Sequence, residues 1–207
     1  MGTARERVPW ALYLAAGVFA AIIVAVVASS FGRSRPPGFL PSPVEPRPAG
    51  TGYVRDTVTI DARDPAAWTF FDFERSGVVP EPEAETWDLA FQRFHVIPNG
   101  GDGLPGGAAA LALPAPFDSV REAPAAGYVV TTGRLDDAPA HTARERWYRD
   151  SVFAHTLEPK DETYVIRTSE GRYAKLRILS YYCPEATPGC VTIDYAYRGD
   201  GSRRLEP

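Results

Sequence analysis

The sequence predicts an all-β, mostly antiparallel domain that is preceded by a single transmembrane helix and a proline-rich linker. Three observations predict this fold class. An uncharged apolar run lies near the N-terminus, a proline-rich run follows it, and the rest alternates short runs of Tyr, Phe, Val and Ile with turns containing Gly and Pro. We divide the chain into a cytoplasmic N-terminus (1–9), a transmembrane helix (10–31), a linker (32–52) and an extracytoplasmic β-domain (53–205).

The apolar run at residues 10–31 carries no charged side chain. As a helix it is long enough to cross a hydrocarbon core of about 30 Å. Aromatic side chains are typical of membrane interfaces. The side chains that we expect to anchor this helix are Trp10, Tyr13, Phe19 and Phe31. A cleaved signal peptide is the competing interpretation, since Val26-Val27-Ala28 before Ser29 resembles a cleavage site. The run exceeds the usual signal core, which favours a retained anchor.

The orientation of the helix follows from its flanks and from the rest of the chain. Arg5 and Arg7 precede it and Arg33 and Arg35 follow it, so the positive-inside count is nearly balanced. The cysteine pair and the bulk of the chain lie after the helix, which favours export of that part. We expect a single-pass protein of the bacterial inner membrane with its C-terminal domain in the periplasm.

The linker run at residues 36–48 is dense in proline and therefore cannot form helix or sheet ladders. It predicts either a semi-rigid spacer that holds the domain off the bilayer or a strap laid across a neighbour. The spacer is the simpler interpretation.

Strand-like runs follow in order through the β-domain. Residues 87–101 read as one long central strand whose apolar parity changes partway, ending in a glycine-rich loop at 99–107. Residues 108–113 fit a short strand or a buried turn, and 147–157 fit strand or helical turn equally. The other expected strands are 54–60, 68–73, 128–132, 164–168, 173–182 and 191–198. In the last of these, alternation predicts one face toward the core and one toward water.

Composition and motifs argue against several functions. The net charge of −4 and the scattered arginines leave no basic stripe for nucleic acid. The loop at 99–107 lacks the Lys-Ser/Thr of a phosphate cradle, and Asp102 alone cannot hold calcium. No nucleophile elbow or zinc-protease helix is present. We expect no enzyme and no metal site.

The two cysteines, Cys183 and Cys190, bound one short loop. In an exported domain such a pair predicts a disulfide, since a metal site would need at least two further ligands.

Several blocks, taken together, resemble the HmuY-like haem-binding proteins of bacterial envelopes. They are Thr57-Val-Thr-Ile-Asp-Ala62, Trp68-Thr-Phe-Phe-Asp-Phe73, Trp87-Asp-Leu-Ala-Phe91 with Asn99-Gly-Gly101, Tyr164-Val-Ile-Arg-Thr-Ser-Glu-Gly171, Ala174-Lys-Leu-Arg-Ile178 and Val191-Thr-Ile-Asp-Tyr-Ala-Tyr197. The resemblance covers residues 54–205 and implies an all-β, mostly antiparallel fold. It also implies haem held between two axial side chains, usually His or Met, in an outer-surface lipoprotein.

This chain departs from that family pattern. It has no lipobox cysteine near its N-terminus, and its only Met is the initiator, so Met ligation is excluded. His155 lies near the family's position for one axial ligand, and His141 is the candidate for the second, although its spacing matches poorly. Trp147, Tyr148 and Phe153 lie between these two histidines and are expected to supply part of the apolar slot that haem needs. His95 shares the parity of Trp87 and reads as a residue at the edge of the core.

Two functions are consistent with this sequence. The first is a non-enzymatic, membrane-anchored periplasmic subunit that docks on a larger inner-membrane complex, for which a photosynthetic reaction-centre–antenna complex is one hypothesis, and which needs no cofactor. The alternative is a membrane-anchored haem-binding or haem-relay protein of the HmuY type.

Overall fold

The computed structural model describes residues 9–31, 35–44, 50–80, 86–132, 141–142, 146–151 and 156–207. Its first unit contains one helix, α1 (Trp10–Phe31), which confirms the predicted apolar helix. The window Trp10–Ala28 has a mean hydropathy of 2.6 and is long enough to cross a membrane. The expected anchoring aromatics, Trp10, Tyr13, Phe19 and Phe31, all belong to α1.

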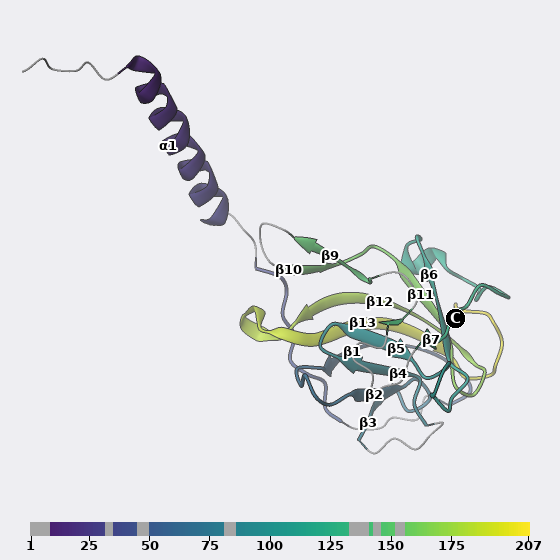
Figure 1. Ribbon diagram of the computed structural model, residues 1–207. Helices are drawn as coiled ribbons and strands as arrows, with labels where there is room; N and C mark the ends of the chain where they lie inside the picture. The colour runs from purple at the N-terminus through teal and green to yellow at the C-terminus, as the bar shows by residue number, and fades with distance from the viewer. Residues whose placement is uncertain are drawn as a thin grey trace, which may run out of the picture. The chain divides into compact units, whose positions relative to one another are not determined.

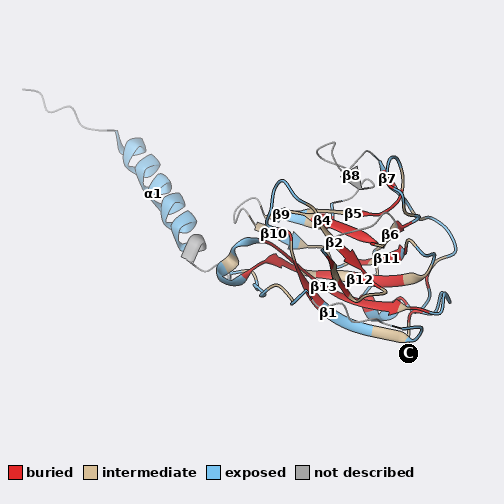
Figure 2. Cartoon of the chain, turned by 90° about the horizontal axis from the view of Figure 1, so that it is seen from below, coloured by how far each residue is buried: buried red, intermediate tan, exposed pale blue. Residues whose placement is uncertain are grey.

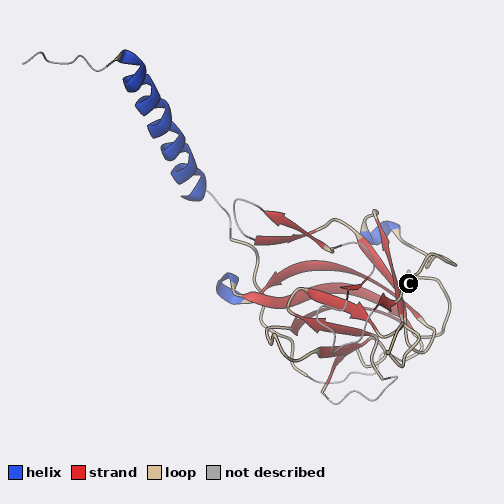
Figure 3. Ribbon diagram, in the orientation of Figure 1, coloured by secondary structure: helices blue, strands red, loops and turns tan. Residues whose placement is uncertain are grey.

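The second unit is the β-domain, and its strands are mostly antiparallel, as predicted (Figures 1 and 3). One sheet has the order β1-β13-β12-β11-β6, with bounds Tyr53–Asp61, Pro188–Arg198, Tyr173–Tyr182, Thr163–Arg167 and Ala109–Leu113. A second sheet has the order β3-β2-β4-β5, with bounds Gly77–Val79, Thr69–Asp72, Leu89–Gln92 and His95–Pro98. Two strand pairs complete the described structure: β7 (Thr131–Thr132) with β8 (His141–Thr142), and β9 (Tyr148–Ser151) with β10 (Thr156–Pro159).

The main core joins the two larger sheets through aromatic side chains. Phe71 and Phe73 of the second sheet lie edge-on to Tyr195 of β13, with ring centroids 5.6 and 5.5 Å apart. Phe73 also stacks on Tyr197 at 6.2 Å. All four side chains are fully buried. Figure 2 shows the buried stretches of β12, β13, β2 and β4 that surround this core. Offset and edge-on ring pairs of this kind add roughly 1 kcal/mol each beyond their buried area.

The prediction that β13 turns one face to water is wrong. Thr192, Asp194 and Ala196 on that face are as buried as the tyrosines opposite them. The Thr59 and Thr192 hydroxyl oxygens lie 3.0 Å apart, and Asp194 accepts hydrogen bonds from Arg55 and Arg177. The outer face is therefore covered by polar partners rather than by solvent.

Irregular segments form the layer that covers this face. The ammonium of Lys175 donates to the carbonyl oxygens of Phe117 and Val120 at 3.0 and 2.7 Å. The same ammonium lies 4.5 Å from the Phe117 ring centroid, within the range of a cation–π contact. Burial lowers the pKa of Lys175. Such segments have no apolar periodicity, so no sequence pattern predicts that they bury a strand face.

The stretch at residues 87–101 also differs from its prediction. It forms a hairpin of β4 and β5 rather than one long strand, with Gln92 opposite His95 and a two-residue turn at Arg93 and Phe94. Arg93 adopts the left-handed backbone conformation, with φ 54°. The change of apolar parity therefore marks a reversal of the chain. Further on, 109–113, 148–151 and 156–159 are strands, whereas the expected strand at 128–132 is reduced to β7.

The glycine-rich loop after β5 is structural, as predicted. Gly101 has φ 111°, and a Cβ there would lie 2.0 Å from the carbonyl oxygen of Thr131. The buried Asn99 side chain donates to the Trp87 carbonyl and accepts from the Gly106 amide. Both contacts hold the loop to its own hairpin, and only glycine fits where the backbones meet.

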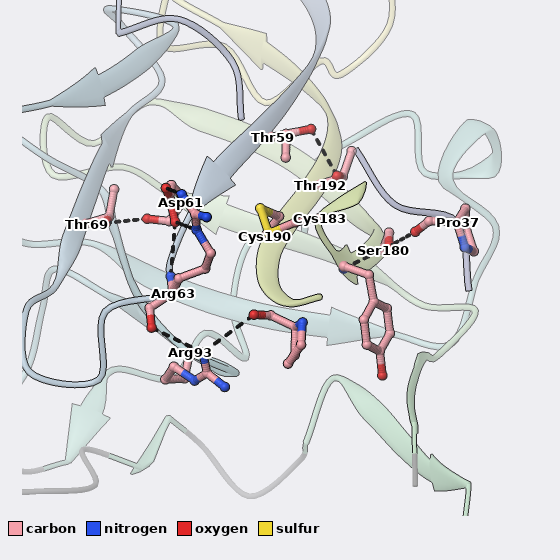
Figure 4. Close-up of a disulfide and its surroundings, with 12 residues drawn as sticks. Pro37, Thr59, Asp61, Arg63, Thr69, Arg93, Ser180, Cys183, Cys190 and Thr192 are labelled. Atoms are coloured by element: carbon pink, nitrogen blue, oxygen red, sulfur yellow. Dashed lines mark hydrogen bonds and ion pairs between the residues drawn. A yellow bond between two sulfur atoms is a disulfide. The ribbon is translucent and has the colours of Figure 1, made fainter. Parts of the chain in front are cut away.

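Residues 36–44, the strap, pack on the β-domain itself and do not form a free spacer. The Phe39 amide donates to the Tyr182 carbonyl at 2.9 Å, and the Ser180 hydroxyl donates to the Pro37 carbonyl. Farther along, the Ser42 amide donates to the Thr59 carbonyl at 2.8 Å. Figure 4 shows the Pro37 end of the strap beside the loop bounded by Cys183 and Cys190. Those cysteines form the predicted disulfide, with an S–S distance of 2.01 Å.

A buried carboxyl joins three segments of the domain. Asp88 is fully buried, and its two carboxyl oxygens accept hydrogen bonds from the amides of Phe73 and Ser169 at 3.0 and 2.8 Å. Loss of hydration, with a smaller contribution from the nearby Glu170 and Asp72 charges, raises the pKa of Asp88 to about 8. The two amides oppose this shift but do not cancel it.

The Asp88 carboxyl should make stability fall as the pH rises. Its folded-state pKa of about 8 lies above the ordinary unfolded value, so its contribution is complete in acid and is lost as the pH approaches 8. We expect the free energy of unfolding to fall by roughly 2 kcal/mol between pH 6 and 8 from this group. Urea unfolding followed by near-UV circular dichroism measures it. Asp88→Asn should flatten this dependence; an unchanged slope in the variant would contradict the assignment.

The strap should detach when a methyl group is added at Gly38. A Cβ at this position would lie 2.1 Å from the Cys183 carbonyl oxygen, so Gly38→Ala must displace the backbone that hydrogen-bonds to Tyr182. Losing that bond costs about 1 kcal/mol, which is a several-fold faster amide hydrogen exchange at Phe39. Gly52→Ala is the matched control, because nothing lies within 4 Å of a Cβ there. Equal exchange in both variants would refute the docked strap.

Candidate functional site

An aromatic cluster forms where the β4–β5 turn meets the start of β9. We define it as Phe94, His95, Trp147, Tyr148 and Tyr181. The centroid of the Phe94 ring lies 4.3 Å from that of His95 and 5.8 Å from that of Tyr148. The ring centroids of Trp147 and Tyr148 are 5.0 Å apart. The Trp147 indole donates to the Phe94 carbonyl at 2.7 Å. This hydrogen bond joins two segments that are distant in the chain.

The cluster is partly open to solvent. Phe94 is 38% exposed, because the two-residue turn leaves its ring outside the core, and His95 is half-buried. Trp147 is buried and packs on Tyr181 of β12 at 5.9 Å. Burial raises the pKa of both Tyr148 and Tyr181, so their hydroxyls stay neutral at physiological pH. The cluster therefore offers an uncharged aromatic wall beside one imidazole.

The structure describes the two predicted haem ligands to different extents. His141 begins β8, opposite Thr132 of β7, and β8 lies beside β5, which carries His95. The side chain of His141 is not among those described, and His155 lies outside the described residues, between β9 and β10. The His141–His155 ligand pair thus stays a prediction. Strand β10, which follows position 155 in the chain, is held to β12, since the Leu157 amide donates to the Tyr182 hydroxyl at 2.8 Å.

The sequence placed His95 at the edge of the core and missed its aromatic neighbours. The missed signal is the Arg93-Phe94 pair between two apolar runs, which marks a tight turn that exposes an aromatic ring. Trp147 and Tyr148 were expected to line a haem slot, and they do lie together. Their contact with Phe94 depends on a pairing across the fold that local sequence does not encode.

Haem needs an apolar, largely uncharged slot and axial imidazoles. The described residues supply the aromatic wall and one imidazole, so a second imidazole for haem would have to come from His141 or His155. Among the described residues no group of three or more His, Cys, Asp or Glu could hold a bare metal ion. The site's composition fits a macrocycle better than a metal ion held by protein side chains alone.

A second feature is a charged hollow of about 430 Å³ near the C-terminus. Its lining is Arg121, Glu122, Ser202, Arg203, Arg204 and Glu206. Ion pairs join Arg203 to Glu122 at 2.8 Å and Arg121 to Glu206 at 3.7 Å. The opposite charges in its wall largely neutralise one another, and the lining includes no histidine or aromatic side chain. The aromatic cluster is therefore the better candidate site.

Comparisons with solved structures agree with the fold. The chain is similar to the apo HmuY analog (TFO) of Tannerella forsythia, with TM-score 0.55, 16% identity, and coverage of 70% of this chain and 96% of that one. It is also similar to a protein of Bacteroides vulgatus ATCC 8482 described as HmuY-like and heme-binding, with TM-score 0.51, 24% identity and coverage of 76% and 96%. The chain is similar as well to apo PinO of Porphyromonas gingivitis, with TM-score 0.54, 13% identity, and coverage of 70% of this chain and 97% of that one.

A search of curated proteins found no match. The family comparison is more direct. Residues 64–195, more than half of the chain, match the family described as HmuY protein. This stretch runs from the end of β1 into β13 and includes every strand of the second sheet. The chain therefore belongs to the HmuY family.

Proposed function

We propose that this protein is a non-enzymatic binding subunit, anchored in the bacterial inner membrane by α1, whose periplasmic β-domain docks on a larger membrane-protein complex. The observation that carries the proposal is the docked strap. Since residues 36–44 are hydrogen-bonded to the domain, little of the proline-rich run is left as a free tether. A fixed subunit needs such a short connection, whereas a collector of distant ligands needs a long one.

The helix supports the same proposal. Its sequence has no charged residue and no polar stripe, so lipid or apolar helices of a partner must surround it. Among the described residues of the β-domain, no group of three or more His, Cys, Asp or Glu could hold a catalytic metal ion. A photosynthetic reaction-centre–antenna complex remains one hypothesis for the partner. The short connection between α1 and the strap supports docking, and native extraction followed by mass spectrometry would identify the partner.

Native extraction tests the docking proposal. We expect a C-terminally tagged full-length chain, extracted from its own membranes in mild detergent, to migrate with an assembly much larger than its 22.6 kDa on native gels. Mass spectrometry of that band identifies the partner. An Asp200→Asn variant, altered at an exposed turn, serves as a neutral control. Migration of the wild-type chain as a free monomer would reject docking.

The second candidate function is haem binding of the HmuY type, and the aromatic cluster beside His95 specifically favours it. Bound haem would supply an iron with two axial positions and two apolar faces. His155 and His141 are the ligands that the family resemblance implies, and His95 is a further imidazole. Phe94, Trp147 and Tyr148 would exclude water from the porphyrin faces.

Haemin titration of the full-length chain in detergent distinguishes the two functions. Haem binding predicts a sharp Soret band of six-coordinate, low-spin iron, and loss of that spectrum in His155→Ala or His141→Ala. His95→Ala tests the third imidazole in the same way. Phe39→Ala is a matched control, because that side chain lies on the strap and outside the cluster. Identical titrations of the wild type and all three histidine variants would reject specific haem ligation.

A further inference from the structure

The strap leaves an apolar surface uncovered. Its backbone is held by β12 and β1, yet the side chains of Phe39, Leu40 and Val44 are 39%, 76% and 53% exposed. The other large apolar side chains exposed on the described β-domain are Phe94, Val129 and Val130. Half of this exposed set therefore belongs to the strap. A rigid backbone that presents apolar side chains to solvent indicates an interaction surface.

The strap is joined to the apolar helix by very little chain. Only residues 32–35 separate α1 from the strap, and a connection of that length reaches at most about 18 Å even when fully extended. Arg33 and Arg35 lie in this connection. Long basic side chains directly after a membrane-spanning helix can place their charges at the headgroup level of a bilayer. When α1 spans a membrane, the strap begins near the membrane surface.

The size and chemistry of the patch favour lipid over protein. Three apolar side chains cannot supply the roughly 800 Å² per partner of a stable protein interface. Phe39 and Leu40 carry no hydrogen-bonding group that would specify a protein partner. An aromatic and an aliphatic side chain on a rigid backbone are typical of segments that insert shallowly at the headgroup boundary.

We propose that Phe39 and Leu40 insert into the headgroup region of the same bilayer that α1 spans, so that the strap seats the β-domain on the membrane surface. This inference rests on the membrane anchoring proposed above. It adds a second attachment point, because the strap is hydrogen-bonded at the end of β12 beside the Cys183–Cys190 loop (Figure 4). That end of the domain would face the lipid.

Fluorescent labelling at one position of the strap tests the proposal. Leu40→Cys provides a unique reactive thiol, because Cys183 and Cys190 are disulfide-bonded. The full-length chain is labelled with an environment-sensitive dye and reconstituted in vesicles of phosphatidylcholine and phosphatidylglycerol. We expect blue-shifted emission and several-fold stronger quenching by lipids that carry a shallow nitroxide than by the same nitroxide in water.

Val130→Cys is the matched control. It replaces an apolar side chain that is 42% exposed and lies next to β7, at the opposite end of the β-domain from the β12–β13 connection (Figures 1 and 2). Its label should behave as water-exposed. If the Leu40 label responds like the Val130 label, the strap does not contact lipid and the inference is overturned. Loss of the whole chain from vesicles in alkaline carbonate would instead reject the membrane anchor itself.

Discussion

The β-domain depends on one constraint, the burial of β13 on both faces between Gly189 and Tyr197. Its Tyr195 and Tyr197 side chains meet Phe71 and Phe73 of the second sheet, while Asp194 on the opposite face lies between Arg55 and Arg177. Burying a carboxylate is unfavourable unless it is paired and hydrogen-bonded. The two guanidinium groups meet this requirement, and the segments that carry or support them are thereby fixed in place. The contacts of this one strand therefore hold together the second sheet, the sheet that contains β13, and the segments that cover its outer face.

Burial on both faces explains why irregular segments matter so much here. The turn at Phe117 receives the Lys175 ammonium, and the strap places Ser42 against Thr59, next to the Thr59–Thr192 contact. Each contact satisfies a polar group that would otherwise be buried without a partner, at a cost of about 1–3 kcal/mol. The strap is thus part of the packing of the sheet.

Sequence reasoning was most successful where neighbouring residues carry the information. The alternation of Val191, Ile193, Tyr195 and Tyr197 predicts a strand with a buried face, and the Cys183–Cys190 spacing predicts the disulfide that the structure contains. It failed where remote segments decide the outcome. The burial of Thr192 depends on Thr59, and the strap depends on a glycine that fits beneath Cys183. The turn at Arg93 was missed because its left-handed backbone conformation is adopted without the glycine or asparagine that usually marks such a turn.

The candidate site was predictable in composition but not in geometry. Trp147 and Tyr148 were expected near a haem slot from their position between two histidines. Their contact with Phe94 and His95 requires that the β4–β5 turn meet β9, which no local pattern encodes. His95 is half-buried, as expected of a residue at the edge of the core, and it belongs to a partly exposed aromatic cluster. Family membership fixes the fold that brings these segments together and leaves the ligand to be determined.

The length of the tether decides what a binding domain of this kind can do. A domain on a long flexible linker samples a large volume, so its effective concentration at any one partner is low. Docking of the strap leaves only residues 32–35 between the strap and α1, which, in the proposed membrane-anchored protein, would raise the effective concentration at partners in the same membrane and disfavour distant ones. A haem-binding domain held in this way could exchange its ligand only with a neighbour at the same bilayer. Both proposed functions would therefore act on a partner at the same membrane.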